Sequence, residues 1–111
     1  MAKIKIPPKN TKEEYDEDEL MWLECDKGYC IFHLTHNREV TTCYRLKGLL
    51  LILDKHKFKR IHDKYAIHVG HVEDYNKRKY KFIIMKDGKV LPIAKRRKTK
   101  VCRFLETYFK K

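Results

Sequence analysis

Short runs of alternating apolar and polar residues make up most of the chain, and turn-forming residues separate them. The alternation predicts β-strands over residues 3–6, 20–24, 29–35, 39–44, 58–62, 65–69, 71–75, 80–85 and 89–93. Asp26-Lys27-Gly28 and Asp87-Gly88 are typical of tight turns, so we expect a β-hairpin at each of these two places.

Two stretches have helical spacing instead. Leucines recur every three or four residues over 46–54, and Val101, Leu105 and Phe109 share one face of a predicted helix over 101–109.

The chain has 111 residues, which suits one domain. We therefore predict a single domain over residues 1–111 that is mostly β, with one short central helix and a C-terminal helix. We expect its core to span about residues 20–105, preceded by an N-terminal strand and an acidic segment in residues 1–19.

Apolar residues inside these elements are the candidate core. We expect Trp22 to be buried and not to serve as a stacking platform for bases. The other predicted core residues are Leu49, Leu50, Phe58, Ile61, Tyr65, Ile67, Phe82, Ile84 and Leu91.

The charge is unevenly distributed. The net charge is +12, and residues 1–76 carry 13 basic and 13 acidic residues, so the whole excess lies in residues 77–111. Such a basic end indicates a polyanionic partner, most commonly nucleic acid, although a solvated basic tail is the simpler alternative. An acidic run over residues 13–19 is open to three interpretations: an exposed turn, a partner for the basic end, or a metal site.

The residues that carry catalysis or bind metals form no recognisable motif. Cys25, Cys30, Cys43 and Cys102 include no CxxC pair, and the six histidines are scattered, so we expect no structural zinc. We also expect no disulfide, and we interpret the cysteines as small apolar packing residues. The chain has no serine and no phosphate-binding loop, so we predict no enzymatic activity and no cofactor. Catalysis by a Cys–His pair remains an open alternative.

No apolar run approaches the ~18 residues that a membrane span needs. The first ten residues lack the apolar region of a signal peptide. We therefore expect a cytoplasmic protein without a membrane partner.

Four segments, in order, resemble the LytTR DNA-binding domain found at the C-terminus of many bacterial two-component response regulators. They are LMWLECDKGYCIFHL, YRLKGLLLIL, FKRIHDKYAIHVGHVEDY and MKDGKVLPIAKRRKTK. The resemblance covers residues 20–105. It implies an elongated fold of several small sheets, whose loops enter successive major grooves of DNA that carries imperfect direct repeats. It also implies a partner receiver domain, which this chain has no room for, so we expect either an excised C-terminal domain or a free-standing regulator.

The resemblance points to three DNA-contacting loops. Lys27 and Tyr29 lie in the first, and Lys64, His68 and His71 in the second. The third contains Lys95, Arg96, Arg97 and Lys98. The family commonly has Asn at the position of His68, and an imidazole cannot copy the bidentate pairing of Asn with adenine. By the same resemblance Arg60 and His62 belong to an Arg-x-His pattern, and we interpret His62 as a residue that pins a turn.

These observations predict sequence-specific binding of double-stranded DNA in bacterial transcription regulation, with a second copy on an adjacent repeat as a further partner. One alternative is an RNA-binding or ribosome-associated basic β module, in which Tyr29, Tyr75 and Tyr80 stack on bases. Another is a protein-interaction domain whose basic end docks an acidic partner.

Overall fold

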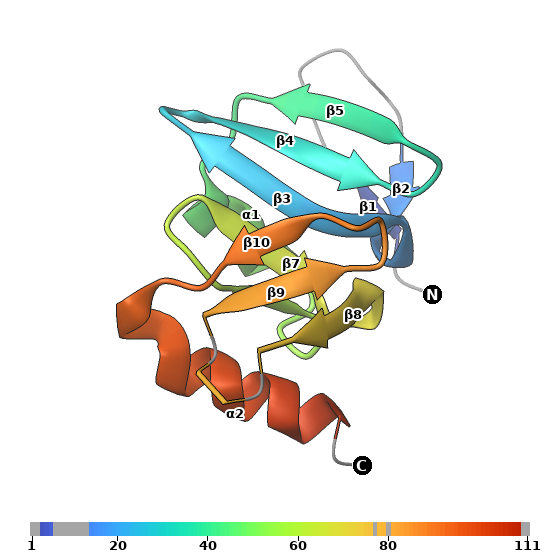
Figure 1. Ribbon diagram of the computed structural model, residues 1–111. Coiled ribbons are helices and arrows are strands. Elements are labelled where there is room, and N and C mark those ends of the chain that lie inside the picture. The colour runs from blue at the N-terminus through green and yellow to red at the C-terminus, as the bar shows by residue number, and fades with distance from the viewer. Residues whose placement is uncertain (1–2, 6–13, 77, 80, 110–111) are drawn as a thin grey trace.

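An antiparallel sheet of five strands forms the centre of the protein (Figure 1). Its order is β5 (Arg38–Thr42), β4 (Tyr29–Leu34), β3 (Leu20–Asp26), β7 (Tyr65–His68) and β6 (Phe58–Arg60). The computed structural model describes residues 3–5, 14–76, 78–79 and 81–109. The sheet therefore joins two sequence-local units, the β3–β4–β5 meander and the β6–β7 hairpin, through the pairing of β3 with β7.

A second antiparallel sheet has the order β10 (Val90–Pro92), β9 (Phe82–Met85) and β8 (Val72–Tyr75). A short pair of strands, β1 (Lys3–Lys5) and β2 (Glu14–Asp16), precedes the main sheet. Within the described residues, the helices are α1 (Leu46–Ile52) and α2 (Lys98–Phe109), and the 3₁₀ turns are η1 (Glu17–Glu19), η2 (Val69–His71) and η3 (Lys95–Arg97). Neither helix in the described part of the chain has the length and apolarity that crossing a membrane requires.

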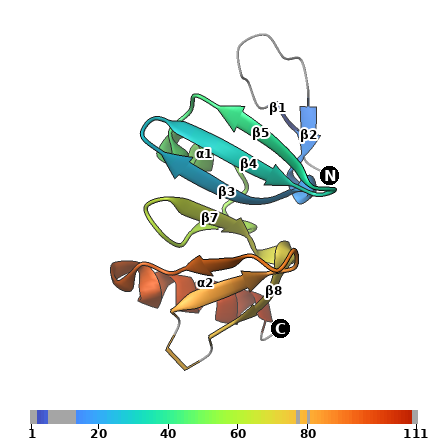
Figure 2. The same ribbon diagram turned by 45° about the horizontal axis from the view of Figure 1, so that its top comes forward.

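The five-stranded sheet is covered on both faces, which creates two cores (Figure 2). On one face α1 packs Leu46, Leu49 and Leu53 against Phe32 and other side chains of the sheet. On the other face Trp22 and Ile67 meet the three-stranded sheet and α2. Alternation along each strand supplies the two faces, since neighbouring residues point in opposite directions. Leu23 and Trp22 accordingly belong to different cores.

These elements confirm the predicted fold class. The molecule is longer in one direction, with principal extents of 44 × 30 × 24 Å. Strand and helix positions agree with the sequence pattern to within a few residues at their ends, and α2 begins at Lys98 rather than at residue 101. The acidic run itself forms strand β2 and the 3₁₀ turn η1. Predicted strand residues Ile6 and Tyr80 lie outside the described residues.

The buried face of β9 is opposite to the predicted one. Ile83 and Met85 are buried, while Phe82 and Ile84 are half-buried. All four residues are apolar, so alternation could not distinguish the two faces. Pairing decides it, because Ile83 lies directly opposite the buried Leu91 of β10. Trp22, Leu49, Phe58, Ile61, Ile67 and Leu91 are buried as predicted, and Leu50 and Tyr65 are half-buried.

The cysteine prediction was wrong for one pair. Cys25 and Cys30 form a disulfide that joins β3 to β4, with their Cα atoms 4.0 Å apart. The two-residue turn at Lys27 and Gly28 causes this, because both residues adopt positive φ (41° and 92°) and set a register that places Cys25 opposite Cys30. Cys43 and Cys102 are free thiols.

Candidate nucleic-acid interface

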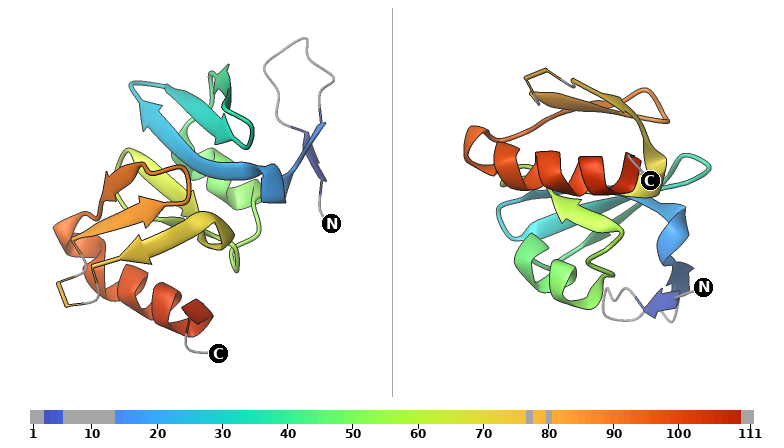
Figure 3. Two further views of the ribbon diagram at one scale, coloured as in Figure 1. Left: turned by 45° about the vertical axis from the view of Figure 1, so that its right-hand side comes forward. Right: turned by 90° about the horizontal axis from the view of Figure 1, so that it is seen from below.

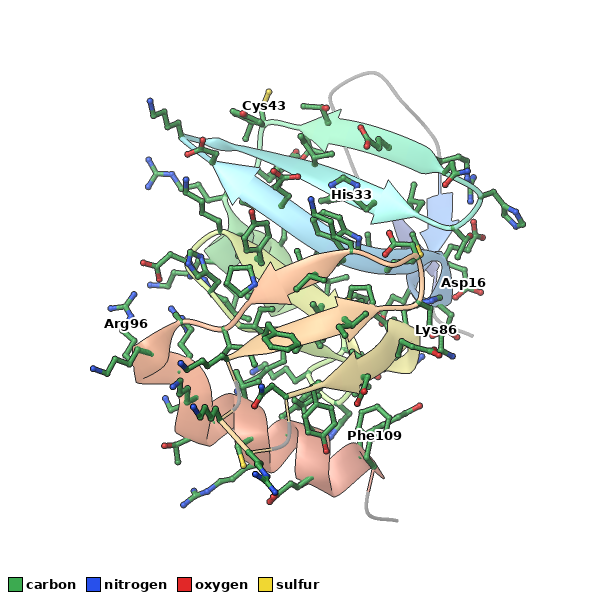
Figure 4. All side chains as sticks on the ribbon, in the orientation of Figure 1. Asp16, His33, Cys43, Lys86, Arg96 and Phe109 are labelled. Atoms are coloured by element: carbon green, nitrogen blue, oxygen red, sulfur yellow. A yellow bond between two sulfur atoms is a disulfide. The ribbon has the colours of Figure 1, made fainter. Side chains whose placement is uncertain are left out.

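Three segments that are distant in sequence lie along one edge of the molecule. They are the β3–β4 turn, the β6–β7 loop and η3, all at the left of Figure 1. Arg96 projects from this edge, and Asp16 and Lys86 lie at the opposite one (Figure 4). These three segments, together with the first residue of β4 and the first residue of α2 directly beside them, carry seven of the nine predicted site residues. The seven are Lys27, Tyr29, Lys64, Lys95, Arg96, Arg97 and Lys98. We call these seven residues the basic loop surface.

Asp63 links the second and third segments. Its Oδ1 lies 2.5 Å from Arg96 Nη2 and 3.4 Å from Arg97 Nη2. The backbone reinforces this link, because the Ala94 N–H donates to the Ile61 carbonyl at 2.8 Å. The Arg96 hydrogen bond is the main reason that the pKa of Asp63 is lowered. The carboxylate is therefore charged, and it orients two arginines on the exposed edge.

Arg60 and His62 hold the β6–β7 loop from within. The Arg60 guanidinium donates to the Asp63 carbonyl at 2.7 Å and to the His62 carbonyl at 3.3 Å. The Lys64 N–H donates to His62 Nδ1 at 3.1 Å. These contacts agree with the interpretation of His62 as a residue that pins this turn. The exposed Lys64 side chain is consequently carried on a loop whose backbone is braced at both ends.

A hollow of about 490 Å³ connects the β3–β4 turn with the start of α1 and the β6–β7 loop. Its charged lining consists of four basic residues, Lys27, Arg45, Lys47 and Arg60, and two acidic residues, Asp26 and Asp63. Tyr29 also lines it. The sequence interpretation missed Arg45, Lys47 and Arg60 as members of this positive edge. The basic residues flanking Leu46 at the start of the predicted helix were the available signal. Basic side chains therefore outnumber acidic ones along this edge between the first segment and the second.

His68 and His71 lie at the other end of β7, away from the basic loop surface. His68 is only 6% exposed, and its Nε2 lies 3.0 Å from Asp18 Oδ1. His71 is half-buried, with Nε2 2.6 Å from the Asp18 carbonyl oxygen. Burial is the main reason that the pKa of His68 is lowered. The ring is thus engaged inside the protein, and it does not share an edge with the other predicted site residues.

The described part of the acidic run anchors neighbouring elements of the fold. Asp18 contacts Lys57 Nζ at 3.2 Å as well as His68, and Glu19 pairs with Arg38. Among the described residues, no three His, Cys, Asp or Glu side chains come together in a way that could hold a metal ion.

The model of the LytTr DNA-binding domain family matches residues 14–106, which is most of the chain. The chain belongs to the LytTR family. LytTR domains bind DNA in transcription regulation, and the family is not a catalytic one.

A solved structure agrees with this assignment at the level of fold. The LytTr DNA-binding domain of a putative methyl-accepting/DNA response regulator from Bacillus cereus superimposes with a TM-score of 0.79. The match covers 95% of this chain and 97% of that one at 16% sequence identity. No curated protein matches this LytTR chain significantly.

Proposed function

We propose that this LytTR domain binds double-stranded DNA sequence-specifically through the basic loop surface. The observation that carries the proposal is the convergence of the β3–β4 turn, the β6–β7 loop and η3 on one positively charged edge. Lysine and arginine side chains on such an edge neutralise phosphates, while Arg96 has the planar fork that pairs with guanine O6 and N7. His68 and His71 are left out of the proposed surface because they contact Asp18 inside the fold.

In this proposal the loops enter successive major grooves, and two copies occupy adjacent direct repeats. The 44 Å long axis supports this arrangement, since one helical turn of DNA spans about 34–36 Å. The family membership and the naming of the Bacillus cereus relative as a response regulator support a role in bacterial two-component transcription regulation. The domain would act in the cytoplasm as a binding module, with no reaction of its own.

Selection of bound sites from a random duplex library tests the proposal directly. Recovery of short direct repeats about one helical turn apart is the expected result. Enrichment of no common sequence would contradict specific binding. Competition by single-stranded RNA at equal salt distinguishes the RNA-binding alternative, because RNA is expected to displace the selected duplex poorly.

The dependence of affinity on salt tests which edge contacts DNA. Each phosphate contact contributes about −0.9 to the slope of log K against log salt. Replacing Lys95 and Arg96 by Ala should flatten this slope, and replacing the exposed Lys86 and Lys89 by Ala should leave it nearly unchanged. Equal slopes for the two double variants would show that η3 is not at the interface.

A further inference from the structure

A groove runs between the two helices, next to the hollow at the β3–β4 turn, with which it shares Lys47 and Arg60. None of the seven residues of the basic loop surface lines this groove. Both α1 and α2 contact β6, and the view from below in Figure 3 shows the two helices on either side of the strands between them. The groove has a volume of about 360 Å³. Phe58 and Leu53 form its buried base, and Leu50 and Phe104 are half-buried in its walls.

The rim on the α1 side is apolar and exposed. Leu51, which lines the groove, is 73% exposed, and its neighbour Ile52 is 55% exposed. Two large aliphatic side chains at the end of a short helix add no contacts to the core there. Apolar surface of this kind, bordered by polar residues, is typical of a site for another macromolecule.

The polar part of the lining is entirely cationic. Lys47, Lys55, Lys59 and Arg60 line the groove, and no carboxylate does. None of the three lysines forms an ion pair with another described residue. Partial burial, together with repulsion from Lys100 and Arg97, lowers the pKa of Lys59. The three lysines therefore concentrate positive charge at the groove, whereas the charge of Arg60 is partly compensated by Asp63.

We propose that this groove docks an acidic amphipathic segment of a partner protein. The apolar side chains of that segment would pack on Leu51, Leu50 and Phe104, and its carboxylates would pair with the lysines that line the groove. Helices with one apolar face bind grooves of this kind, and complementary charge steers them to the site. Duplex DNA fits the lining less well. Its phosphates would satisfy the lysines, but its sugar–phosphate backbone offers little apolar surface to cover Leu51 and Ile52.

The test uses the full chain and a fluorescein-labelled synthetic helical peptide of about four turns. The peptide has Leu and Phe on one face and Glu on the other, and a control peptide of identical composition has a scrambled order. Fluorescence anisotropy should show that the parent chain binds the amphipathic peptide more tightly than the scrambled one. Leu51→Asp should weaken this binding at least about tenfold. The matched control is Val90→Asp, because Val90 is also exposed (54%) but lies on β10 away from the groove.

Affinity for random genomic duplex is measured on the same three chains. Unchanged duplex binding by Leu51→Asp is the expected result. If Leu51→Asp loses duplex affinity and Val90→Asp keeps it, the groove is part of the DNA surface and the proposal is wrong. The proposal is also wrong if the parent binds both peptides equally, or if the two variants bind the amphipathic peptide alike. A parent chain that binds the peptide as expected but no duplex would instead overturn the proposed DNA contacts.

Discussion

His68 Nε2 lies 3.0 Å from Asp18 Oδ1, which fastens the end of β7 to the acidic turn η1 fifty residues earlier. The second ring nitrogen of His68 is also occupied, because Nδ1 accepts the Gly70 N–H at 2.8 Å. The proton of the neutral ring is therefore on Nε2, which donates to the Asp18 carboxylate. Lys57 Nζ contacts the same carboxylate oxygen at 3.2 Å. This arrangement requires a His68 imidazole that carries no proton on Nδ1.

Stability should decrease as the pH falls below about 6.5, the ordinary pKa of histidine. Burial lowers the pKa of His68 in the folded protein, so the unfolded chain takes up the proton first. The contribution of neutral His68 to the free energy of unfolding is complete above pH ~6.5. It is lost as the pH falls toward the pKa of His68 in the folded protein, by at most about 1.4 kcal/mol per pH unit. Urea unfolding of the parent and of His68→Gln over pH 7.5–5.5 measures this.

His68→Gln should be less stable at neutral pH and should show a smaller loss on acidification. His56→Gln is the matched control, because His56 is exposed in a turn, and it should keep the parent's pH dependence. An unaltered slope in His68→Gln would show that another group titrates. Asp18, whose pKa is lowered chiefly by its hydrogen bond to His68, adds a loss only at more acidic pH.

Gly70→Ala should destabilise the fold by about 1–3 kcal/mol. A Cβ at this position would lie 2.9 Å from His68 Cε1 and 3.1 Å from His68 Nδ1, so the ring would have to leave its bonded position. The comparison is Gly48→Ala in α1, where no atom lies within 4 Å of the added Cβ. That change should stabilise the protein by up to about 1 kcal/mol. Denaturant unfolding measures both changes. A shift of the free energy of unfolding in the same direction for the two variants would contradict this interpretation.

Reduction of the Cys25–Cys30 disulfide should lower the free energy of unfolding by about 2 kcal/mol, because the closed loop is short. The measurement is thermal or denaturant unfolding with and without a thiol reductant. A double variant with Ala at both positions should be insensitive to the reductant, and Cys43→Ala should respond like the parent. If the double variant still responds, the effect comes from Cys43 or Cys102.

Ile83→Ala should cost about 2–5 kcal/mol, as expected for a fully buried aliphatic side chain. Ile84→Ala, the same change one residue further along β9, should cost clearly less because Ile84 is only half-buried. Two unfolding titrations under identical conditions make the comparison. Equal losses would mean that the face of β9 assigned here to the core is wrong.

Local sequence patterns predicted both helices, every described strand except β2, and the charge asymmetry. Strand alternation, helical leucine spacing and the Lys27–Gly28 turn are local properties, because side-chain direction and turn conformation depend on neighbouring residues. The three loops of the proposed surface were named from the resemblance to the LytTR family. The resemblance in residues 20–105 also identified the family correctly.

Contacts between distant segments followed from the three-dimensional packing of the chain and not from local patterns. The Asp87-Gly88 turn predicted that β9 pairs with β10, but all four residues of β9 are apolar, so its buried face followed only from the position of Ile83 opposite the buried Leu91. Local patterns also could not place His68 against Asp18, or Asp63 between Arg96 and Arg97, since these contacts join segments 33–50 residues apart. Long-range contacts depend on how the whole chain closes its two cores, and a side chain's chemical role depends on that outcome. For this reason residues 62–71 divide between the exposed basic edge and a buried histidine contact.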